Sequence, residues 1–367
     1  MFKKQLQIKF KFFIQKIFTL IYGKVRVFDF NNKNNEKTLN IEGISSDKNP
    51  NKEYLLYKTI NGRIYTDTNQ NVAIINNDNF ISDSSFQHID NELKDVSFNS
   101  VITKGTPRFK KKFKGNIFNL AQGGSGNNYF HFIFDLIPKI YLLEKVFSVE
   151  SINYFYVPKI TEWQKKIYTL LNIDERKLID SEKFRHIQGD LIISVSHPWY
   201  FKNDFQSETK NIPDWIINYN RNKFLPLMKN FNKNEKIFLD RSSSKYNHCQ
   251  IINNDEISNF LKDKGFSIYN MEKLDFKNQI YLFNKASIII GAHGAAFTNL
   301  IFCEPKTKVI ELIPSSHPSQ KCKRISEILN LNYHRIETKD YYKENYPDSI
   351  FLDKTDLKKI ESIIDLY

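Results

Sequence analysis

The sequence predicts an α/β protein of two domains, and three observations lead to this fold class. At 367 residues the chain is longer than one hydrophobic core usually serves. Its second half alternates short apolar segments with helical patterns, which is the order of a parallel sheet covered by helices. One apolar segment, 286–290, runs directly into a glycine-containing loop, as a buried strand of a doubly wound sheet does.

The charge of the chain indicates its class of partner, and its cysteine content indicates its compartment and whether it holds a metal. The formal net charge of +13 favours anionic partners such as phosphate-bearing substrates, an acidic membrane surface or nucleic acid. None of the recognisable nucleic-acid-binding signatures occurs, so we predict no nucleic-acid partner. Cys249, Cys303 and Cys322 lack the spacing of a zinc site or a disulfide framework, so we expect no metal and a protein of the reducing cytoplasm.

Residues 1–30 form a basic, amphipathic segment. Lys9, Lys11 and Lys16 interrupt its apolar residues too often for a membrane span or a secretory signal. The apolar residues recur near helical spacing, and two interpretations of that pattern stay open. The helix lies on an anionic membrane surface, which would make the protein peripheral on the inner face of the membrane, or it docks on the protein's own core.

The rest of the chain divides into three parts. Residues 31–228 are expected to form an N-terminal α/β domain. In it, 30–55 is a polar linker or surface excursion, and a hairpin joins strands 63–67 and 72–75. A long helical pattern starts near 127 and is bent or broken at Pro138. Strand 153–157, helix 162–171, strand 191–195 and a helix from Pro213 to Phe224 follow. Residues 229–340 are expected to form the C-terminal Rossmann-like domain, with strands at 236–240, 266–269, 286–290, 308–312 and 333–336. Residues 341–367 end in a helix that we expect to pack back toward the N-terminal domain.

The loop after strand 286–290 is the most informative segment. Its small residues, 291–296, let backbone approach backbone, and a helix begins at once, so several N–H groups are available for phosphate oxygens. His293 at the tip is suited to donate to a diphosphate or to carry a proton. A glycine loop alone is a weak signal, because glycines occur wherever a strand and a helix pack closely. Asn299, one turn further on, and Glu311, near the end of the next strand where ribose hydroxyls are often bound, strengthen it.

This whole run resembles the characteristic motif of glycosyltransferase family 61. In that motif G-x-H-G-A is followed by T-N-L-x-F and by an apolar strand ending in Glu and Pro. The matching residues are Gly291, His293, Gly294, Ala295, Thr298, Asn299, Leu300, Phe302, Glu311 and Pro314. Upstream, the strand ending in Arg241, the helix start at 253–257 and Gln279 before an apolar helix are also similar to the family.

The resemblance implies a GT-B fold, with two Rossmann-like domains facing across a cleft and extra β structure in the N-terminal region. It implies an inverting, metal-independent transfer of a sugar from a nucleotide-diphosphate donor to a hydroxyl of a growing surface glycan or lipid-linked glycan, as in bacterial capsule assembly. The nucleotide sugar is a substrate, and no cofactor is expected. The donor-binding residues that the resemblance assigns are Arg241, Gly291, His293, Gly294, Ala295, Asn299 and Glu311.

One position departs from the family pattern. Family members often carry a second Arg shortly before the helix start, and here that position is Cys249. Lys245 and His248 are the candidates for auxiliary phosphate contacts, although an ammonium does not reproduce a bidentate guanidinium.

A second segment, residues 128–138, resembles the family's N-x-x-H-x-x-x-D-x-x-P pattern. His131 and Asp135 are four residues apart, so on a helix they share one face and the Asp can orient the imidazole. This predicts His131 as the base that takes the acceptor hydroxyl's proton. The alternative is that His131 only fills a hydrogen bond in the core.

Two other functions stay open beside the transferase. The same fold and diphosphate site serve sugar-nucleotide epimerases and hydrolases, which act on the donor without an acceptor. The other alternative is that the protein binds a nucleotide sugar without catalysing a reaction, which the missing second Arg suggests.

Overall fold

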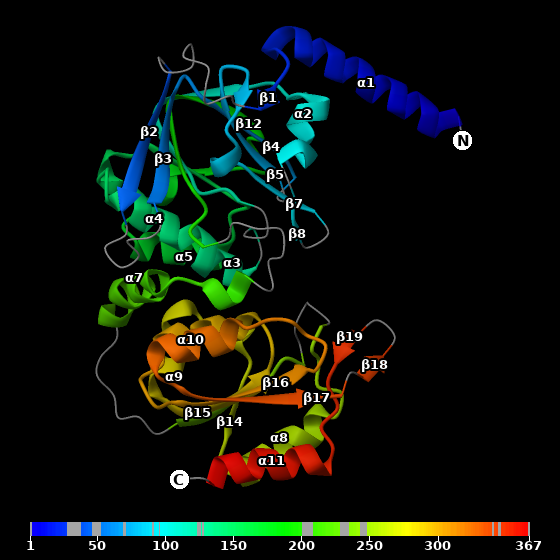
Figure 1. Ribbon diagram of the computed structural model, residues 1–367, viewed down its shortest axis with the longest axis vertical. Coiled ribbons are helices and arrows are strands. Elements are labelled where there is room, and N and C mark those ends of the chain that lie inside the picture. The colour runs from blue at the N-terminus through cyan, green and yellow to red at the C-terminus, as the bar shows by residue number, and fades with distance from the viewer. Residues whose placement is uncertain are drawn as a thin grey trace. The chain divides into compact units, whose positions relative to one another are not determined.

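The computed structural model describes residues 2–27, 38–45, 53–68, 71–89, 92–94, 96–122, 126, 128–199, 208–227, 235–242, 248–339, 341–343 and 346–365. The chain divides into two compact units, Met1–Phe205 and Gln206–Tyr367, and Figure 1 draws the elements of both. We call them unit 1 and unit 2. Each is an α/β structure that contains parallel strands, as predicted.

The boundary after Phe205 differs from the one expected at 228. Helix α7 (Asp214–Phe224) belongs to unit 2 because its side chains pack there. The Phe224 ring lies 4.9 Å from the Phe276 ring, and Arg221 donates to the main-chain oxygens of Ile301 and Cys303 at 2.7 Å. The Lys- and Asn-rich segment that suggested the later boundary, 229–236, lies mostly outside the described residues.

Unit 1 contains a mixed sheet. Strands β9 (Lys111–Asn119), β10 (Tyr154–Val157), β11 (Leu178–Asp180) and β12 (His186–Val195) are parallel, in the order β11-β10-β9-β12. This is the strand order of one half of a Rossmann fold. Helix α3 (Tyr129–His131), the π-helix η4 (Phe132–Leu136) and α4 (Ile137–Glu144) connect β9 to β10, and α5 (Glu162–Leu170) connects β10 to β11.

The other strands of unit 1 make the extra β structure that was expected. They are β1 (Arg26–Val27), β2 (Leu39–Ser45), β3 (Glu53–Ile60), β4 (Arg63–Thr68), β5 (Asn71–Asn76), β6 (Asn79–Phe80), β7 (Phe86–Ile89) and β8 (Glu92–Leu93). The predicted hairpin is β4–β5. Residues 30–55 were wrongly expected to be only a surface excursion, since β2 and β3 start within them and pair antiparallel, with Leu39 and Ile44 buried.

Unit 2 is a doubly wound domain, as predicted. Its parallel sheet has the order β14-β13-β15-β16-β17, formed by β13 (Glu235–Leu239), β14 (Ser267–Tyr269), β15 (Ala286–Ala292), β16 (Lys308–Pro314) and β17 (Asn332–Thr338). Helices α9 (Phe276–Lys285) and α10 (Lys321–Leu329) lie on one side of this sheet, and α8 (Asn254–Asp263) and α11 (Lys354–Asp365) on the other (Figure 1). Ligands of such sheets bind at the carboxyl ends of the strands, where the strand order reverses, which here is between β13 and β15.

The C-terminal helix α11 does not behave as expected. Its Ile360 and Ile364 are buried in the core of unit 2 with Leu261 and Ile310, and Lys308 donates to the carbonyl of Ile363 at 2.6 Å. The apolar face that suggested docking on the N-terminal domain is therefore covered by the helix's own unit. A hairpin of β18 (Tyr341–Lys343) and β19 (Tyr346–Ser349) precedes it.

The described residues also form α1 (Phe2–Tyr22), which confirms the predicted amphipathic helix, α2 (Ser100–Lys104) and the 3₁₀-helix η10 (Ala295–Phe302). Single helical turns lie at Ser82–Ser84, Val96–Phe98, Val149–Ser151, Glu175–Lys177, Thr209–Asn211, Leu225–Leu227 and Met271–Lys273. Within the described part of the chain, no helix has both the length and the apolarity that a bilayer crossing requires.

Candidate functional site

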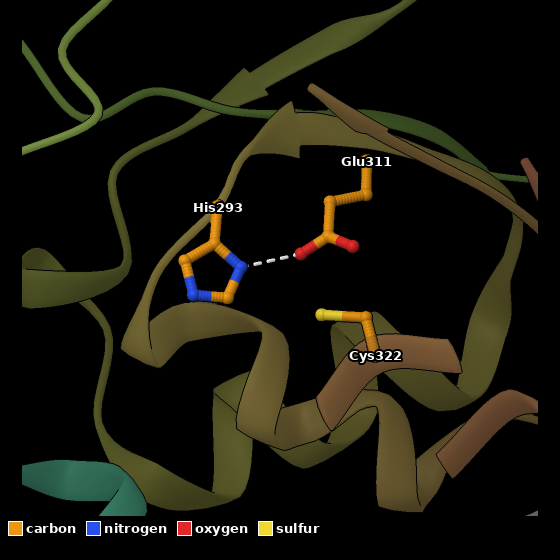
Figure 2. Close-up of side chains that lie close together, drawn as sticks. All are labelled: His293, Glu311 and Cys322. Atoms are coloured by element: carbon orange, nitrogen blue, oxygen red, sulfur yellow. Dashed lines mark hydrogen bonds and ion pairs between the residues drawn. The ribbon is translucent and has the colours of Figure 1, made fainter. Parts of the chain in front are cut away.

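The first group of candidate residues lies at the carboxyl edge of the sheet of unit 2. Figure 2 shows His293 at the end of β15, Glu311 on the neighbouring strand β16 and Cys322 on α10. His293 Nδ1 lies 2.5 Å from Glu311 Oε1, and the Tyr333 hydroxyl donates to Glu311 Oε2 at 2.5 Å. Both carboxylate oxygens therefore already have protein donors.

Glu311 was expected to bind a ribose hydroxyl, and in the structure its carboxylate accepts hydrogen bonds from His293 and Tyr333. It is fully buried and orients His293, whose Nε2 points away from the carboxylate (Figure 2). Burial works to raise the pKa of Glu311, but hydrogen bonds from His293, Cys322 and Tyr333 outweigh it and hold the pKa at about 2. Burial lowers the pKa of His293 to about 4, so a neutral imidazole donates Nδ1–H to a charged carboxylate.

The donor atoms of His293, Glu311 and Cys322 lie within 4.8 Å of one another, a spacing that metal sites also have. However, His293 and Glu311 are joined by a direct hydrogen bond, and the ammonium of Lys321 lies close enough to lower the pKa of His293 further. A divalent cation would have to break that bond beside a positive charge. We therefore interpret the three residues as a hydrogen-bond network.

Arg241, which follows β13, lies against the glycine loop. A Cβ atom added to Gly294 would be 1.4 Å from Arg241 Nη1, so only glycine leaves room for this guanidinium. Gly294 has an extended backbone that any residue adopts, and its requirement is one of space. Arg241 Nη2 donates to the carbonyl of His248 at 3.2 Å. Gly291 is similarly crowded, since its Cβ would lie 2.9 Å from that of Leu239.

Lys321 completes this group, and the sequence did not single it out. It is buried at the first residue of α10 and donates to the carbonyl of Gly294 at 2.9 Å. A cation at a helix N-terminus opposes the helix dipole, which is the signal that could have drawn attention to it. Burial, and then the positive charge of Arg241, lowers the pKa of Lys321.

We call Arg241, His248, His293, His317 and Lys321 the cationic cluster. The rings of His293 and His317 lie 4.3 Å apart. Burial, Arg241, His317 and Lys321 together lower the pKa of His248 to about 4. The three imidazoles are neutral at pH 7, whereas Arg241 and Lys321 are charged and lie close enough together that Arg241 lowers the pKa of Lys321. Two cations so close together are stabilised when an anion binds between them.

The loop amides match the prediction only in part. The N–H of His293 donates to Leu312 O at 2.8 Å and so extends the pairing of β15 with β16. The helix that follows, η10 (Ala295–Phe302), is a 3₁₀-helix. The N–H groups of Ala295 and Ala296, as the first of that helix, have no partner within it and are the loop amides suited to an anion.

Asn299 was expected to bind the donor, and the structure places its side chain in the interior of unit 2. It is fully buried in η10, and its Nδ2 donates to Gln279 Oε1 at 2.8 Å. Gln279 in turn donates to the carbonyls of Met271 and Leu274. Asn299 and Gln279 thus form one polar link between η10 and the start of α9, which explains physically why both occur in the motif.

Replacing Asn299 by Ala should therefore lower the free energy of unfolding by about 1–3 kcal/mol, because a buried amide oxygen of Gln279 loses its donor. Nucleoside-diphosphate affinity should stay unchanged in the folded protein. Chemical denaturation and calorimetric titration measure the two quantities, and Asn278→Ala, at an exposed position next to Gln279 on α9, is the control. An affinity loss at unchanged stability would restore Asn299 to the donor site.

The second group of candidates lies in unit 1. The side chain of Asn128 caps the helix start by accepting from the N–H groups of Phe130 and His131. Pro138, which has no N–H, follows the wider π-turn of η4 instead of breaking the helix. His131 Nδ1 lies 2.7 Å from Asp135 Oδ2, so the predicted pair is formed.

Residues from two strand ends complete the surroundings of Asp135. Trp199 Nε1 donates to Asp135 Oδ1 at 2.8 Å, and Gln122 Nε2 donates to Oδ2 at 3.0 Å and lies 2.8 Å from His197 Nε2. Gln122 follows β9, whereas His197 and Trp199 follow the parallel neighbour β12, so all three meet at the carboxyl edge of the sheet. The sequence did not assign them roles, although His-Pro-Trp directly after an apolar strand was a usable signal.

The electrostatics of this group favour a charged carboxylate and a basic Nε2 on His131. Burial works to raise the pKa of Asp135, but His131 and His197 outweigh it and hold the pKa well below its usual range. With Nδ1–H donated to Asp135, the basic nitrogen of His131 is Nε2. Lys139, buried one turn after Asp135, has its pKa lowered to about 8 by burial, against the opposing effect of Asp135.

Comparison with known proteins covers part of each group. Residues 129–310 match the family model described as Glycosyltransferase 61. The chain belongs to glycosyltransferase family 61. It is also 38% identical over 69 residues to the Beta-1,2-xylosyltransferase RCN11 of Oryza sativa subsp. japonica, a match of 19% of this chain and 13% of the rice protein's length.

The departure of this family 61 chain at Cys249 can now be placed. Cys249 is buried in the core of unit 2, and burial raises the pKa of its thiol to about 12, so it supplies no charge. Lys245 lies outside the described residues, and His248 contacts Arg241 through its carbonyl. Among the residues that the structure describes, Lys321 is therefore the cation that accompanies Arg241 in the site.

Two histidines, the half-buried His248 and the buried His293, predict an acid-sensitive fold for this family 61 protein. Burial lowers the pKa of His248 and His293 to about 4, while the unfolded chain titrates near 6.5. Above pH 6.5 both states are neutral. Below it the unfolded state binds more protons, so stability should fall progressively between pH 6.5 and 4. Thermal melting across this range measures the loss, and His293→Gln should flatten the slope, whereas an unchanged slope would contradict the assignment.

Proposed function

We propose that the protein transfers a sugar from a nucleoside-diphosphate donor to a hydroxyl of a glycan acceptor, with inversion at the anomeric carbon. The cationic cluster carries this proposal. It lies at the carboxyl edge of a doubly wound sheet, at the point where the strand order reverses. It contains two cations, the half-buried Arg241 and the buried Lys321, whose charges a diphosphate neutralises. Membership of glycosyltransferase family 61 supports the same reaction class.

In the proposed reaction, His131 Nε2 takes the proton of the acceptor hydroxyl while its oxygen forms a bond to the anomeric carbon. The bond from that carbon to the diphosphate oxygen breaks on the opposite face, and the nucleoside diphosphate leaves with the electron pair. Asp135 stabilises the imidazolium that forms. Arg241, Lys321 and the first amides of η10 stabilise the charge of the leaving diphosphate, which is the task that a metal ion has in other transferases.

The donor sugar and the acceptor belong to the same proposal. We propose a growing surface glycan or lipid-linked glycan as the acceptor. Because the rice relative is named a xylosyltransferase, nucleoside-diphosphate xylose is the first donor to test. All three cysteines are buried thiols, which supports a reducing, cytoplasmic location.

A thermal-shift screen of nucleoside diphosphates and their sugars against the full chain tests the proposal. A ligand at 100 times its Kd stabilises the fold by about 2.7 kcal/mol, which is readily seen in the melting temperature. Mass spectrometry of mixtures with and without glycan acceptors then follows the sugar, and EDTA should leave transfer unchanged. Donor consumption without any acceptor would indicate an epimerase or hydrolase, and binding without turnover would indicate a non-catalytic relative. No shift with any nucleoside diphosphate would overturn the donor site.

A further inference from the structure

Helix α1 exposes one continuous apolar stripe. Leu6, Phe10, Phe13, Leu20 and Ile21 are spaced four, three, seven and one residues apart, so they share one face of the helix, and all are exposed. Figure 1 shows α1 extending away from the strands of unit 1. The stripe is therefore not covered by the unit to which the helix belongs.

Only the end of α1 docks on unit 1. The ring of Phe18 lies 5.0 Å from that of Phe109, and the Tyr22 hydroxyl accepts from the N–H of Lys110. Phe18 is buried, whereas Phe10 and Phe13 are 64% and 59% exposed. Of the two interpretations of the amphipathic pattern, docking on the core thus applies to the last turns alone.

The charges around the stripe have one sign. Residues 2–22 contain five lysines and no acidic residue, and Lys4, Lys9, Lys11 and Lys16 are exposed. Lys9 and Lys16 flank the stripe on one side, and Lys4 and Lys11 on the other, as the helical spacing requires. At the base of the helix, Phe109 is 82% exposed within a second basic segment, 108–114, whose sequence is RFKKKFK.

We propose that α1 binds flat in the headgroup region of an anionic lipid bilayer, with the stripe buried among the acyl chains and the lysines at the phosphates. An exposed apolar face flanked by cations is the pattern of interfacial helices. A second copy of the same helix is a poorer occupant, because its lysines would meet lysines across the contact.

Flotation of the full chain with vesicles tests this surface and does not depend on sugar transfer. The protein should bind vesicles of 70% phosphatidylcholine and 30% phosphatidylglycerol, bind pure phosphatidylcholine at least about tenfold more weakly, and be released by high salt. The double variant Phe10→Ser/Phe13→Ser should weaken partitioning by about tenfold or more.

The matched control is Ile8→Ser/Phe12→Ser. These side chains are 61% and 57% exposed on the same helix but lie off the stripe, so their loss should change partitioning far less. Equal losses in the two variants, or equal binding to neutral and anionic vesicles, would overturn the proposal. Light scattering without lipid gives a second test. A wild-type dimer that Phe10→Ser/Phe13→Ser dissociates would show that a second copy of the chain covers the stripe, and would overturn the proposal.

Discussion

Replacing His131 by Ala should lower the kcat of sugar transfer by about 10²- to 10⁴-fold, which is the usual contribution of a general base. Its Nδ1 is held 2.7 Å from Asp135 Oδ2, so the variant loses the basic Nε2 that would receive the acceptor proton. Donor affinity should change little, because the cationic cluster lies in unit 2. Initial rates at saturating donor and acceptor measure the effect.

Two further variants separate catalysis from folding. Asp135→Asn keeps the shape of the carboxylate but not its charge, so it should also lower kcat strongly. His186→Gln changes another buried histidine of unit 1, whose Nδ1 lies 2.8 Å from Arg108 O, and should alter stability without altering kcat. If His131→Ala transfers sugar at the rate of the wild type, His131 only fills a core hydrogen bond and the proposed mechanism fails.

Replacing Gly294 by Ala should weaken nucleoside-diphosphate binding by about 10- to 100-fold, the loss expected when a charged hydrogen-bonding group leaves its site. The new Cβ would lie 1.4 Å from Arg241 Nη1, so the guanidinium must move away. Calorimetric titration of the full chain measures the affinity. Transfer activity should fall in parallel at low donor concentration.

The double variant Arg241→Ala/Gly294→Ala makes this prediction specific. If the Ala at 294 acts only by displacing Arg241, the double variant should bind no more weakly than Arg241→Ala alone. Gly265→Ala is the control glycine: its φ of +81° strains any side chain, while no atom lies within 4 Å of the added Cβ. That variant should lose stability and keep its affinity, and additive losses in the double variant would count against the proposed contact.

Features that depend on residues close together in the sequence were predictable from it. The parallel strands of unit 2 appear at nearly the expected positions, because each is a short apolar run followed by a helical period. The pairing of His131 with Asp135 was equally accessible, since a spacing of four residues places two side chains on one helical face. The glycine loop was recognised too, because strand, loop and helix follow one another directly.

The roles of single residues in the site needed the tertiary structure. Gln122 and His197 approach Asp135 from strand ends that the sheet places side by side, although they are 75 residues apart in the chain. Asn299 looked like a ligand contact because it follows the loop, yet the packing of η10 on α9 buries it against Gln279. Lys321 joins the cationic cluster only because α10 starts beside Gly294.

The amino-acid sequence alone determined the alternation of strands and helices in unit 2, the His131–Asp135 pair and the amphipathic character of α1, because each arises from spacing along one element. The tertiary structure decided that Glu311 orients His293, that Arg241 needs the space at Gly294, and that the stripe of α1 is uncovered by its own unit. These depend on which elements become neighbours, and the spacing within one element carries no information about what another element places against it.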